Sequence, residues 1–500
     1  MVMEGEGESE QSHNVVLFPF MAQGHMIPML DIARMLANHG LAVTLVTTPL
    51  NAVWIRTILD RAASSSCRVR VLDIEFPCAE VGLPEGCESV DLLPSNDLMI
   101  NFFRATELLQ EPFEKLIRQE VENPLCIISD MFLGWTVETA KVLGIPRIVF
   151  HGTSCFSCCC SSCIHEKKPH INVGSDTEPF MLPGLPHDIS LTRAQLSEFS
   201  KGNSELMAAG FSRVLEEMRR ANSHSYGSIV NSFEELESEY VNHYRNVVGM
   251  KAWPIGPVSL CNRDQIDKAE RGKKAPVDES ACLRWLDSQK PESVVYVCFG
   301  SLCRLAPQQL TDIGLGLEAS GLPFIWVLRG DREQVDQWLP EGFEERVKGR
   351  GMVIKGWAPQ ILILSHPATG GFVTHCGWNS TLEGLTAGLP MVAWPLNAEQ
   401  PMNAKLVVDV LKVAVPIVFD TQGVVPKEAV EQAVSEMMGN GEMRGRAREL
   451  GEMARRAVEE GGSSYMNLTL FIQDMIAYKK ARTMDTAPVC DSPPTCTSSK

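Results

Sequence analysis

The sequence predicts an α/β protein with two open, parallel-sheet halves. Apolar segments of strand length alternate with amphipathic segments of helix length, an order typical of parallel sheets covered by helices on both faces. The alternation pauses near residue 250 and then begins again. The 500 residues also exceed what one hydrophobic core usually supports, so more than one domain is expected.

The first half begins with the strand pattern HNVVLFPF at 13–20, a loop at 21–26 and a helix at 27–40. Pro28 suits the first turn of that helix, and Gly40 suits its end. Six further segments continue the alternation of strands and helices. They are 41–48, 50–63 and 67–76, then PLCIISD at 124–130 with the helix pattern 134–144 and the strand pattern 146–152. Residues 13–250 are therefore expected to form the first domain.

The stretch KAWPIGPVSL at 251–260 has two prolines and a glycine, which favour a domain linker. The charged stretch 262–280 is expected to be an exposed loop. Strand and helix patterns then alternate again at 292–301, 306–320, 323–329, 351–357, 359–365, 370–375, 379–388 and 391–395. A second domain is expected at 261–462, followed by a helix at 463–478 that packs back on the first domain.

Composition excludes several classes of function. The formal net charge of −17 argues against a nucleic-acid or anionic-membrane partner, because both need a basic face. The acidic start MVMEGEGESEQ does not resemble a secretory signal, so a cytosolic monomer without a membrane span is expected. The polar ends, 1–12 and 479–500, are expected to be disordered.

The 16 cysteines are scattered along a chain with no signal peptide, so reduced thiols are expected. The cluster CFSCCCSSC at 155–163 contains two CxxC pairs, which raises the alternative of a metal site. Only one residue separates the pairs, whereas zinc sites usually space them by a dozen or more. Small side chains that pack a helix closely against a sheet are the favoured interpretation.

Ligands of open parallel sheets bind beyond the carboxyl ends of the strands. In the second half this rule selects loops at 300–301, 357–360, 375–380 and 397–400, and in the first half loops at 23–25, 129–130 and 152–153. If the two halves face each other, all of these loops border one cleft.

The loop at 375–380 reads HCGWNS and joins a buried strand to a helix. A helix start offers unpaired N–H groups and partial positive charge, which suit a phosphate. Gly377 allows close approach of the backbone, Asn379 and Ser380 supply donors, and Glu383 projects from the same helix face. The alternative is simple N-capping of a core helix, which is common.

The run from Trp357 to Gln400, WAPQILILSHPATGGFVTHCGWNSTLEGLTAGLPMVAWPLNAEQ, resembles the signature box of plant secondary-product UDP-glycosyltransferases, which are inverting enzymes of glycosyltransferase family 1. FPFMAQGHMIPMLDIARML, NSFEELE, YVCFGS and FIWVLR also occur in the expected order. The resemblance implies the GT-B fold, in which two Rossmann-like halves face each other across a cleft. The donor nucleotide is then expected in the C-terminal half and the acceptor mainly in the N-terminal half.

The resemblance also implies roles for residues at matching positions. Trp357 stacks on uracil, Ala358 and Gln360 hold the base and ribose, and Glu383 binds the ribose hydroxyls. His375 and Gly377 meet one phosphate, while Asn379, Ser380 and Ser301 meet the other. Trp378, Glu399 and Gln400 contact the sugar, and Thr153 touches it from the other domain. Cys298 and Asn397 depart from the residues that are frequent at their positions, which leaves the sugar preference less defined.

His25, in AQGHMIPML, matches the catalytic histidine of the family, and Asp130, in CIISDMF, matches the aspartate that orients it. An unperturbed imidazole is mostly neutral at pH 7 and can accept the proton of an acceptor hydroxyl. The implied reaction is a single displacement from UDP-glucose that needs no metal and no bound cofactor. The alternative for Asp130 is a helix cap, a role it can combine with the first.

Three alternatives were weighed. A Rossmann-type dehydrogenase predicts GxGxxG after the first strand, where this chain has FMAQGHMIP. A non-catalytic nucleotide-sugar binder does not account for His25 and Asp130 together, and transfer to nitrogen or sulfur stays open. The loops near 80–105 and 175–210 resemble a subgroup that glucosylates flavonoids, other phenolics, terpenoids or hormones. Phenolic acceptors rank first and terpenoids second.

Overall fold

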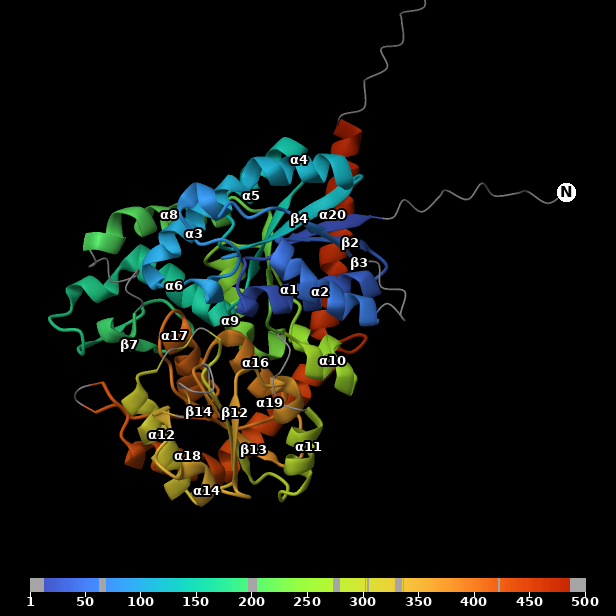
Figure 1. Ribbon diagram of the computed structural model, residues 1–500. Helices are drawn as coiled ribbons and strands as arrows, with labels where there is room; N and C mark the ends of the chain where they lie inside the picture. Colours follow the sequence, from blue (N-terminus) through green and yellow to red (C-terminus); the bar gives the residue numbers. More distant parts are fainter. Residues whose placement is uncertain are drawn as a thin grey trace, which may run out of the picture.

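The computed structural model describes residues 13–62, 69–196, 205–272, 279–301, 303, 305–328, 335, 337–420 and 423–485. It forms two parallel-sheet α/β halves, drawn one above the other in Figure 1, which confirms the predicted fold class. Residues 1–12 and 486–500, which include most of the expected disordered ends, lie outside the described residues.

The first sheet has seven parallel strands in the order β3-β2-β1-β4-β5-β8-β9. They are β1 (Asn14–Phe18), β2 (Ala42–Thr47), β3 (Val69–Asp73), β4 (Pro124–Asp130), β5 (Arg147–His151), β8 (Gly227–Val230) and β9 (Ala252–Pro254). The strand order reverses between β1 and β4, which pair directly, with Leu17 beside Ile128. Such a reversal opens a crevice at the carboxyl ends of the two strands.

The second sheet has six parallel strands in the order β12-β11-β10-β13-β14-β15. They are β10 (Val294–Cys298), β11 (Phe324–Leu328), β12 (Gly351–Lys355), β13 (Thr369–Thr374), β14 (Met391–Ala393) and β15 (Ala414–Pro416). Its order reverses between β10 and β13, so a second crevice opens after Cys298 and Thr374. A short antiparallel hairpin, β6 (Pro179–Met181) and β7 (Ser190–Thr192), stands apart from both sheets.

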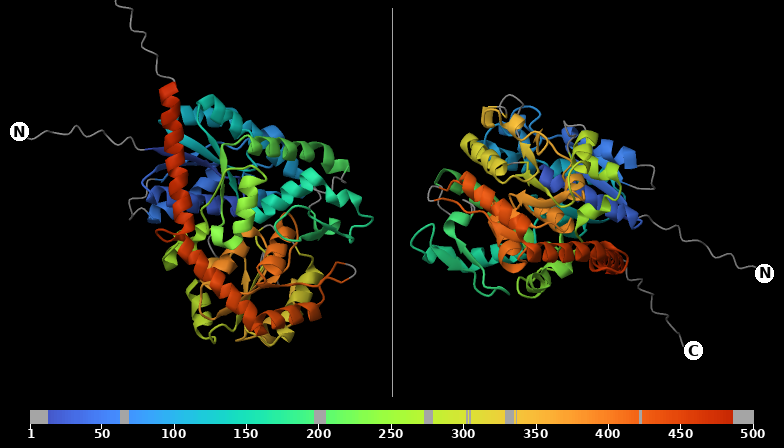
Figure 2. Two further views of the ribbon diagram at one scale, coloured as in Figure 1. Left: turned by 180° about the vertical axis from the view of Figure 1, so that it is seen from behind. Right: turned by 90° about the horizontal axis from the view of Figure 1, so that it is seen from below.

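Helices connect the strands and cover both sheets (Figures 1 and 2). In the first half they are α1 (Gln23–Asn38), α2 (Pro49–Ala62), α3 (Met99–Leu108), α4 (Gln110–Glu120), α5 (Thr136–Leu143), α6 (Cys155–Lys167), α8 (Glu205–Ser223) and α9 (Glu234–Asn246). Those that follow are α10 (Gln265–Glu270), α11 (Glu279–Asp287), α12 (Pro307–Ala319), α14 (Phe343–Arg346), α15 (Gln360–Leu364), α16 (Trp378–Thr386), α17 (Gln400–Lys405), α18 (Lys427–Gly439), α19 (Gly441–Val458) and α20 (Ser463–Asp485).

The last helix, α20, returns to the first half of the chain, as the red ribbon beside β4 shows in Figure 1. Its side chains Leu468, Phe471 and Met475 are buried in the same apolar cluster as Leu17 and Ile128 of the first sheet. The chain therefore crosses between the halves twice, once near residue 260 and once at the start of α20.

Element boundaries differ from the sequence predictions in three places. α1 begins at Gln23, so the expected loop at 21–26 is mostly the first turn of the helix. The expected linker contains β9, because Ala252 and Trp253 are buried and pair with β8 as the edge strand of the first sheet. α20 continues past residue 478 to Asp485, so residues 479–485 are helical rather than disordered.

Candidate active site

His25 and Asp130 meet at the crevice of the first sheet. Asp130 is the last residue of β4, and His25 lies in the first turn of α1, after the neighbouring strand β1. The His25 Nδ1 and Asp130 Oδ2 atoms are 2.7 Å apart. The carboxylate is fully buried, whereas the imidazole side chain keeps 23% of its surface exposed. The pair therefore leaves Nε2 as the ring nitrogen that can act on a ligand.

Asp130 also has a second partner. Its Oδ1 accepts a hydrogen bond of 3.0 Å from the backbone N–H of Phe132, which fixes the carboxylate plane. Beneath it, the buried Arg147 side chain donates to the Asp130 carbonyl oxygen at 3.1 Å. The aspartate thus serves both as a turn cap and as a rigid support for the histidine.

The charge of Asp130 sets the proton affinity of His25. Burial by itself lowers the pKa of the imidazole, but the Asp130 charge and hydrogen bond, aided by the charge of Glu399, raise it above the usual value of 6.5. A raised pKa makes His25 a stronger base that becomes charged readily when it takes a proton.

Aromatic rings surround the exposed side of His25. The ring centroids of Phe20 and Phe132 lie 5.6 Å and 5.3 Å from that of His25. Phe102 and Phe103 of α3 pack on Phe20 at 5.7 Å and 5.5 Å. Phe20, Phe102 and Phe103 are buried, and Phe132 keeps part of its ring exposed, so a flat ring can pack on Phe132 with the other three rings behind it.

In the second half, α16 begins directly after β13 and points its N-terminus at the crevice of the second sheet. The imidazole of His375 lies against Gly300 and Gly377, where an added Cβ would come within 2.5 Å and 2.4 Å of Nε2. Only glycine leaves room for the ring at both positions. Burial lowers the pKa of His375 to about 4, so the side chain is neutral and can donate one N–H.

Three side chains expected at the ribose and phosphates lie together behind this helix start. Gln360 Nε2 donates to Ser380 Oγ at 3.1 Å and to Glu383 Oε2 at 2.7 Å. Trp357 and the buried Ala358 lie in the loop after β12, and only Pro359 separates them from Gln360. The structure therefore brings Trp357, Gln360, Ser380 and Glu383 into one group.

Glu399 and Gln400 lie at the start of α17, Glu399 just before the helix and Gln400 as its first residue. Burial raises the pKa of Glu399, while nearby His25 opposes the shift, so the two side chains interact across the halves. Gln400 uses its amide within its own loop, accepting from the backbone N–H groups of Leu396 and Asn397 at 2.9 Å and 3.0 Å. In this structure, these hydrogen bonds of Gln400 hold the backbone at 396–397 in place.

Trp378, which is expected to contact the sugar, has an indole that faces the first half of the chain. The indole is buried, and its Nε1 donates to the backbone oxygen of Asn231, in the first half, at 2.7 Å. The side chain thus binds the two halves together, and its backbone hydrogen-bonds with Glu399.

A direct contact joins the start of α16 to the histidine turn. Asn379 Nδ2 donates to the carbonyl oxygen of Gly24 at 2.6 Å. That carbonyl would normally accept from the N–H four residues later in α1, but residue 28 is proline and has no N–H. Pro28 therefore frees the Gly24 oxygen for Asn379, and Figure 1 shows α16 beside α1 where the halves meet.

Two expected contacts occupy loops at the same edges. Ser301 follows β10, and Thr153 lies between β5 and α6 with its hydroxyl buried and without a hydrogen-bond partner among the described residues. Neighbouring Gly152 also lines His25, because an added Cβ there would lie 3.8 Å from Nδ1.

The cysteine cluster packs α6 as expected from its small side chains. Cys155, Cys159, Cys160 and Cys163 are buried thiols whose pKa values burial raises. Within the described part of the chain, no group of three or more His, Cys, Asp or Glu side chains is arranged to hold a metal ion.

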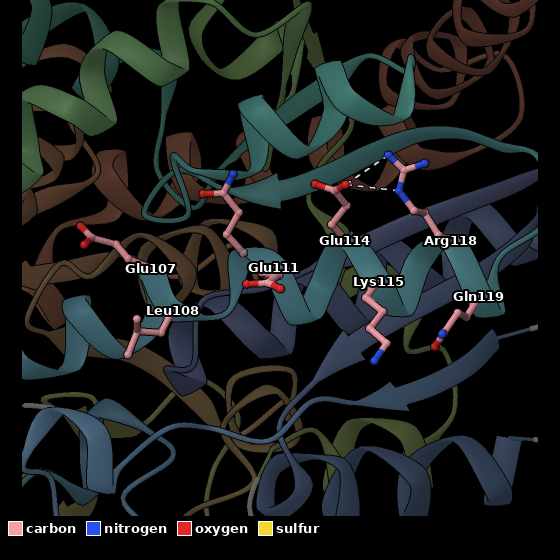
Figure 3. Close-up of a pocket in the computed structure, with 8 residues that line it drawn as sticks. Glu107, Leu108, Glu111, Glu114, Lys115, Arg118 and Gln119 are labelled. Atoms are coloured by element: carbon pink, nitrogen blue, oxygen red, sulfur yellow. Dashed lines mark hydrogen bonds and ion pairs between the residues drawn. The ribbon is translucent and has the colours of Figure 1, made fainter.

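A hollow of about 580 Å³ lies elsewhere, along the outer face of α4 (Figure 3). Glu114 and Arg118 form an ion pair there, and the other lining side chains are mostly charged or polar. None of the expected site residues lines it. No helix in the described ranges is long and apolar enough to cross a membrane.

Sequence reasoning missed two residues of this site. Asn231 receives the Trp378 indole, and Arg271 forms an ion pair with Glu383. Arg271 lies in the stretch that was expected to be an exposed loop, yet 91% of its side chain is covered, because two carboxylates compensate its charge. Nothing in the local sequence distinguishes it from the neighbouring charged residues.

Comparisons with known proteins agree with this arrangement. The chain matches the family model described as UDP-glucoronosyl and UDP-glucosyl transferase over residues 201–453, and the model described as glycosyltransferase, N-terminal domain, over residues 11–260. It is 50% identical to scopoletin glucosyltransferase of Nicotiana tabacum, over 92% of this chain and 97% of the relative. It is 46% identical to UDP-glucose flavonoid 3-O-glucosyltransferase 7 of Fragaria ananassa, over 95% and 98%.

Among solved structures, the fold is similar to that of a Glycyrrhiza uralensis UGT crystallised with glycyrrhetinic acid 3-O-monoglucuronide. The TM-score is 0.86 and the identity 39%, with 95% of this chain and 98% of that chain covered.

Proposed function

Because the chain belongs to the plant family 1 UDP-glycosyltransferases and has their GT-B fold, we propose that it transfers glucose from UDP-glucose, with inversion, to a hydroxyl of a small plant phenolic. One observation carries the proposal: the His25–Asp130 pair of the first half lies beside the start of α16, through the contact between Gly24 and Asn379. We assign residues 13–250 to acceptor binding and residues 261–462 to the donor.

In the proposed reaction, His25 Nε2 takes the proton of the acceptor hydroxyl as the oxygen attacks the anomeric carbon. The bond between that carbon and the phosphate oxygen breaks, and UDP leaves from the opposite face with the electron pair. Asp130 keeps the proton of His25 on Nδ1 and stabilises the imidazolium that forms. The short Nδ1 to Oδ2 distance of 2.7 Å supports this role.

The donor site is proposed to consist of Trp357, Ala358 and Gln360 for the base, Glu383 for the ribose, and the start of α16 with His375 and Ser301 for the phosphates. Helix N–H groups stabilise the charge that grows on the leaving phosphate. These hydrogen-bond donors are proposed to stabilise the leaving phosphate without the help of a metal ion. Trp378, Glu399, Gln400 and Thr153 are proposed to contact the sugar.

A phenolic acceptor is favoured by the apolar wall beside His25, where the partly exposed ring of Phe132 is backed by the buried rings of Phe20, Phe102 and Phe103. Flat aromatic rings pack well on such a wall. A phenol also has a pKa of about 10, so it loses its proton to an imidazole more easily than an aliphatic alcohol does. Terpenoid alcohols rank second on this ground.

The test is incubation of the purified protein with UDP-glucose and a panel of flavonoids, simple phenolics, terpenoid alcohols, anilines and thiols, with products identified by mass spectrometry. The proposal expects hexosides of phenols, of the β configuration by NMR. Parallel reactions with UDP-galactose and UDP-glucuronate test the donor. Products confined to amines, thiols or aliphatic alcohols, or a preference for another donor, would refute it.

A further inference from the structure

A short segment between the two halves covers the expected nucleotide site. It comprises residues 264–272 and is called the strap below. It begins at Asp264, whose carboxylate caps α10 by accepting from the backbone N–H of Asp267 at 2.7 Å. It ends at Arg271 and Gly272, which reach the donor half.

Arg271 links the two halves through two buried carboxylates. Its Nε donates to Asp31 of α1 at 2.8 Å, and its Nη1 pairs with Glu383 of α16. Exposed fractions are 9% for the Arg271 side chain, 3% for Asp31 and 6% for Glu383, so water screens these pairs little.

Both oxygens of Glu383 are thereby occupied. Oε1 pairs with Arg271, and Oε2 accepts from Gln360 Nε2 at 2.7 Å. Two ribose hydroxyls that donate to this carboxylate need those same oxygens. A carboxylate offers about four lone-pair positions, so the hydroxyls would have to share both oxygens with Arg271 and Gln360 and compete with them for the same space.

Gly272 occupies the space beside the expected base platform. An added Cβ at Gly272 would lie 2.3 Å from Cζ2 of Trp357 and 3.1 Å from Cδ1 of Ile27. The glycine backbone is therefore wedged between the indole of the donor half and α1 of the acceptor half. A base that stacks on this part of Trp357 requires Gly272 to shift.

The base of the strap is fastened to α1 by side-chain hydrogen bonds, while α10 also packs against α15 of the donor half. Arg34 donates to Asn262 Oδ1 at 2.7 Å and to Asp267 Oδ2 at 2.6 Å. Asn262 in turn donates to Asp31 at 2.9 Å. Arg271 can therefore leave Glu383 and keep Asp31 as its counter-ion, so its charge does not become uncompensated.

We propose that the strap competes with the uridine part of the donor: Arg271 and Gly272 hold Glu383 and Trp357 when the site is empty, and the ribose and base displace them when UDP-sugar binds. The inference rests on the proposed function, since it uses Glu383 and Trp357 as nucleotide contacts. A ligand that binds only the open form has an apparent affinity reduced by the fraction of molecules that are open. The strap therefore weakens nucleotide binding and opens when the nucleotide enters.

The first test compares the affinity of uridine and of UDP for the unaltered protein, Arg271→Ala, Arg263→Ala and Glu383→Gln by calorimetry. Uridine carries no phosphate, so loss of a positive charge does not itself weaken its binding. Arg271→Ala is expected to bind uridine about three-fold or more tightly. The exposed Arg263 lies just before the strap, and its replacement is expected to change nothing.

Unchanged or weaker uridine binding by Arg271→Ala would refute the proposed competition between the strap and the nucleotide, and it would leave the proposed function intact. Glu383→Gln also frees Arg271, so it is compared with Arg271→Ala in the double variant Arg271→Ala/Glu383→Gln. A double variant that binds uridine as well as Arg271→Ala alone would refute the nucleotide role of Glu383, and with it the donor site proposed above. The two failures are therefore distinguishable.

A second measurement needs no variant. Hydrogen–deuterium exchange of residues 265–271 in the unaltered protein is expected to speed up when UDP is added, while the α1 segment around Arg34 keeps its rate. Slower or unchanged exchange in residues 265–271 upon UDP binding would refute the proposed displacement of the strap.

Discussion

Replacement of Asp130 by asparagine tests how the base is positioned. One carboxylate oxygen faces His25 Nδ1 at 2.7 Å, and the other faces the Phe132 N–H at 3.0 Å. An asparagine must place its oxygen toward the Phe132 N–H, because its own NH₂ group would be repelled there. The NH₂ then faces Nδ1, which must act as an acceptor, and the proton of the neutral ring moves to Nε2. The nitrogen that should take the acceptor's proton is then already occupied.

The magnitude follows from what is lost. A hydrogen bond to a charged group contributes about 1.5–3 kcal/mol, which corresponds to about 10- to 150-fold in rate. General-base catalysis contributes about 10²–10⁴-fold in rate, and part of this factor is lost when the wrong histidine tautomer is present. We therefore expect kcat/KM for Asp130→Asn to fall about 10²-fold or more.

The assay is the initial rate of glucosylation of one phenolic acceptor from about pH 5 to about pH 9, a range that spans imidazole titration. Because Asp130 raises the pKa of His25, the acid limb of the variant should also shift to lower pH. The control is UDP affinity, which should stay unchanged because Asp130 lies in the other half. The reasoning would be refuted if Asp130→Asn kept most of its activity and the acid side of its pH–rate profile did not move.

Four further predictions follow from the same site. In the unaltered protein, kcat/KM should rise with pH through a pKa above 6.5 and then level off, because the raised pKa of His25 leaves less neutral base at low pH; a limb below 6.5 would contradict this. His25→Ala should lose transfer about 10²-fold or more yet bind UDP normally, and unchanged turnover would remove it as the base. Trp357→Ala should weaken UDP binding about ten-fold, a stacking contribution of about 1–3 kcal/mol, as measured by calorimetry, while the acceptor still binds. Turnover should be unchanged after dialysis against EDTA, and a loss restored by Mg²⁺ would show a metal requirement.

The sequence predicted the fold well because its signals are local. Parallel strands that are buried on both faces give continuous apolar runs, and those around Val16 and Phe372 were found from the runs alone. The rule that ligands bind at strand ends selects His25, Asp130 and the loop at His375 from the sequence alone.

Other features depend on contacts that the local pattern does not record. The chain reads as a loop before Ile27, but α1 starts at Gln23, because the turn around His25 packs against β4 and α16. Pro28 indicated a helix start, whereas in the structure it stands inside α1 and frees a carbonyl.

Arg271 and Trp378 show a second limit. A basic residue in a charged stretch is usually solvated, and its burial here depends on Asp31 and Glu383, which lie far away in the sequence. Trp378 is expected at the sugar from its match to a family position, and the sequence does not show that its indole also joins the halves. The contacts of Arg271 and of the Trp378 indole can be predicted only when the relative position of the two sheets is known.

The return of α20 to the first sheet constrains how such chains can be recombined. A fragment that stops near residue 260 would leave the surface under Leu468, Phe471 and Met475 open to solvent, and the complementary fragment would carry an apolar helix without its sheet. Chimeras that exchange acceptor and donor halves between two parents therefore need two junctions. The segment 463–485 should come from the parent that supplies the first half, so that the covering helix and its sheet have a common origin.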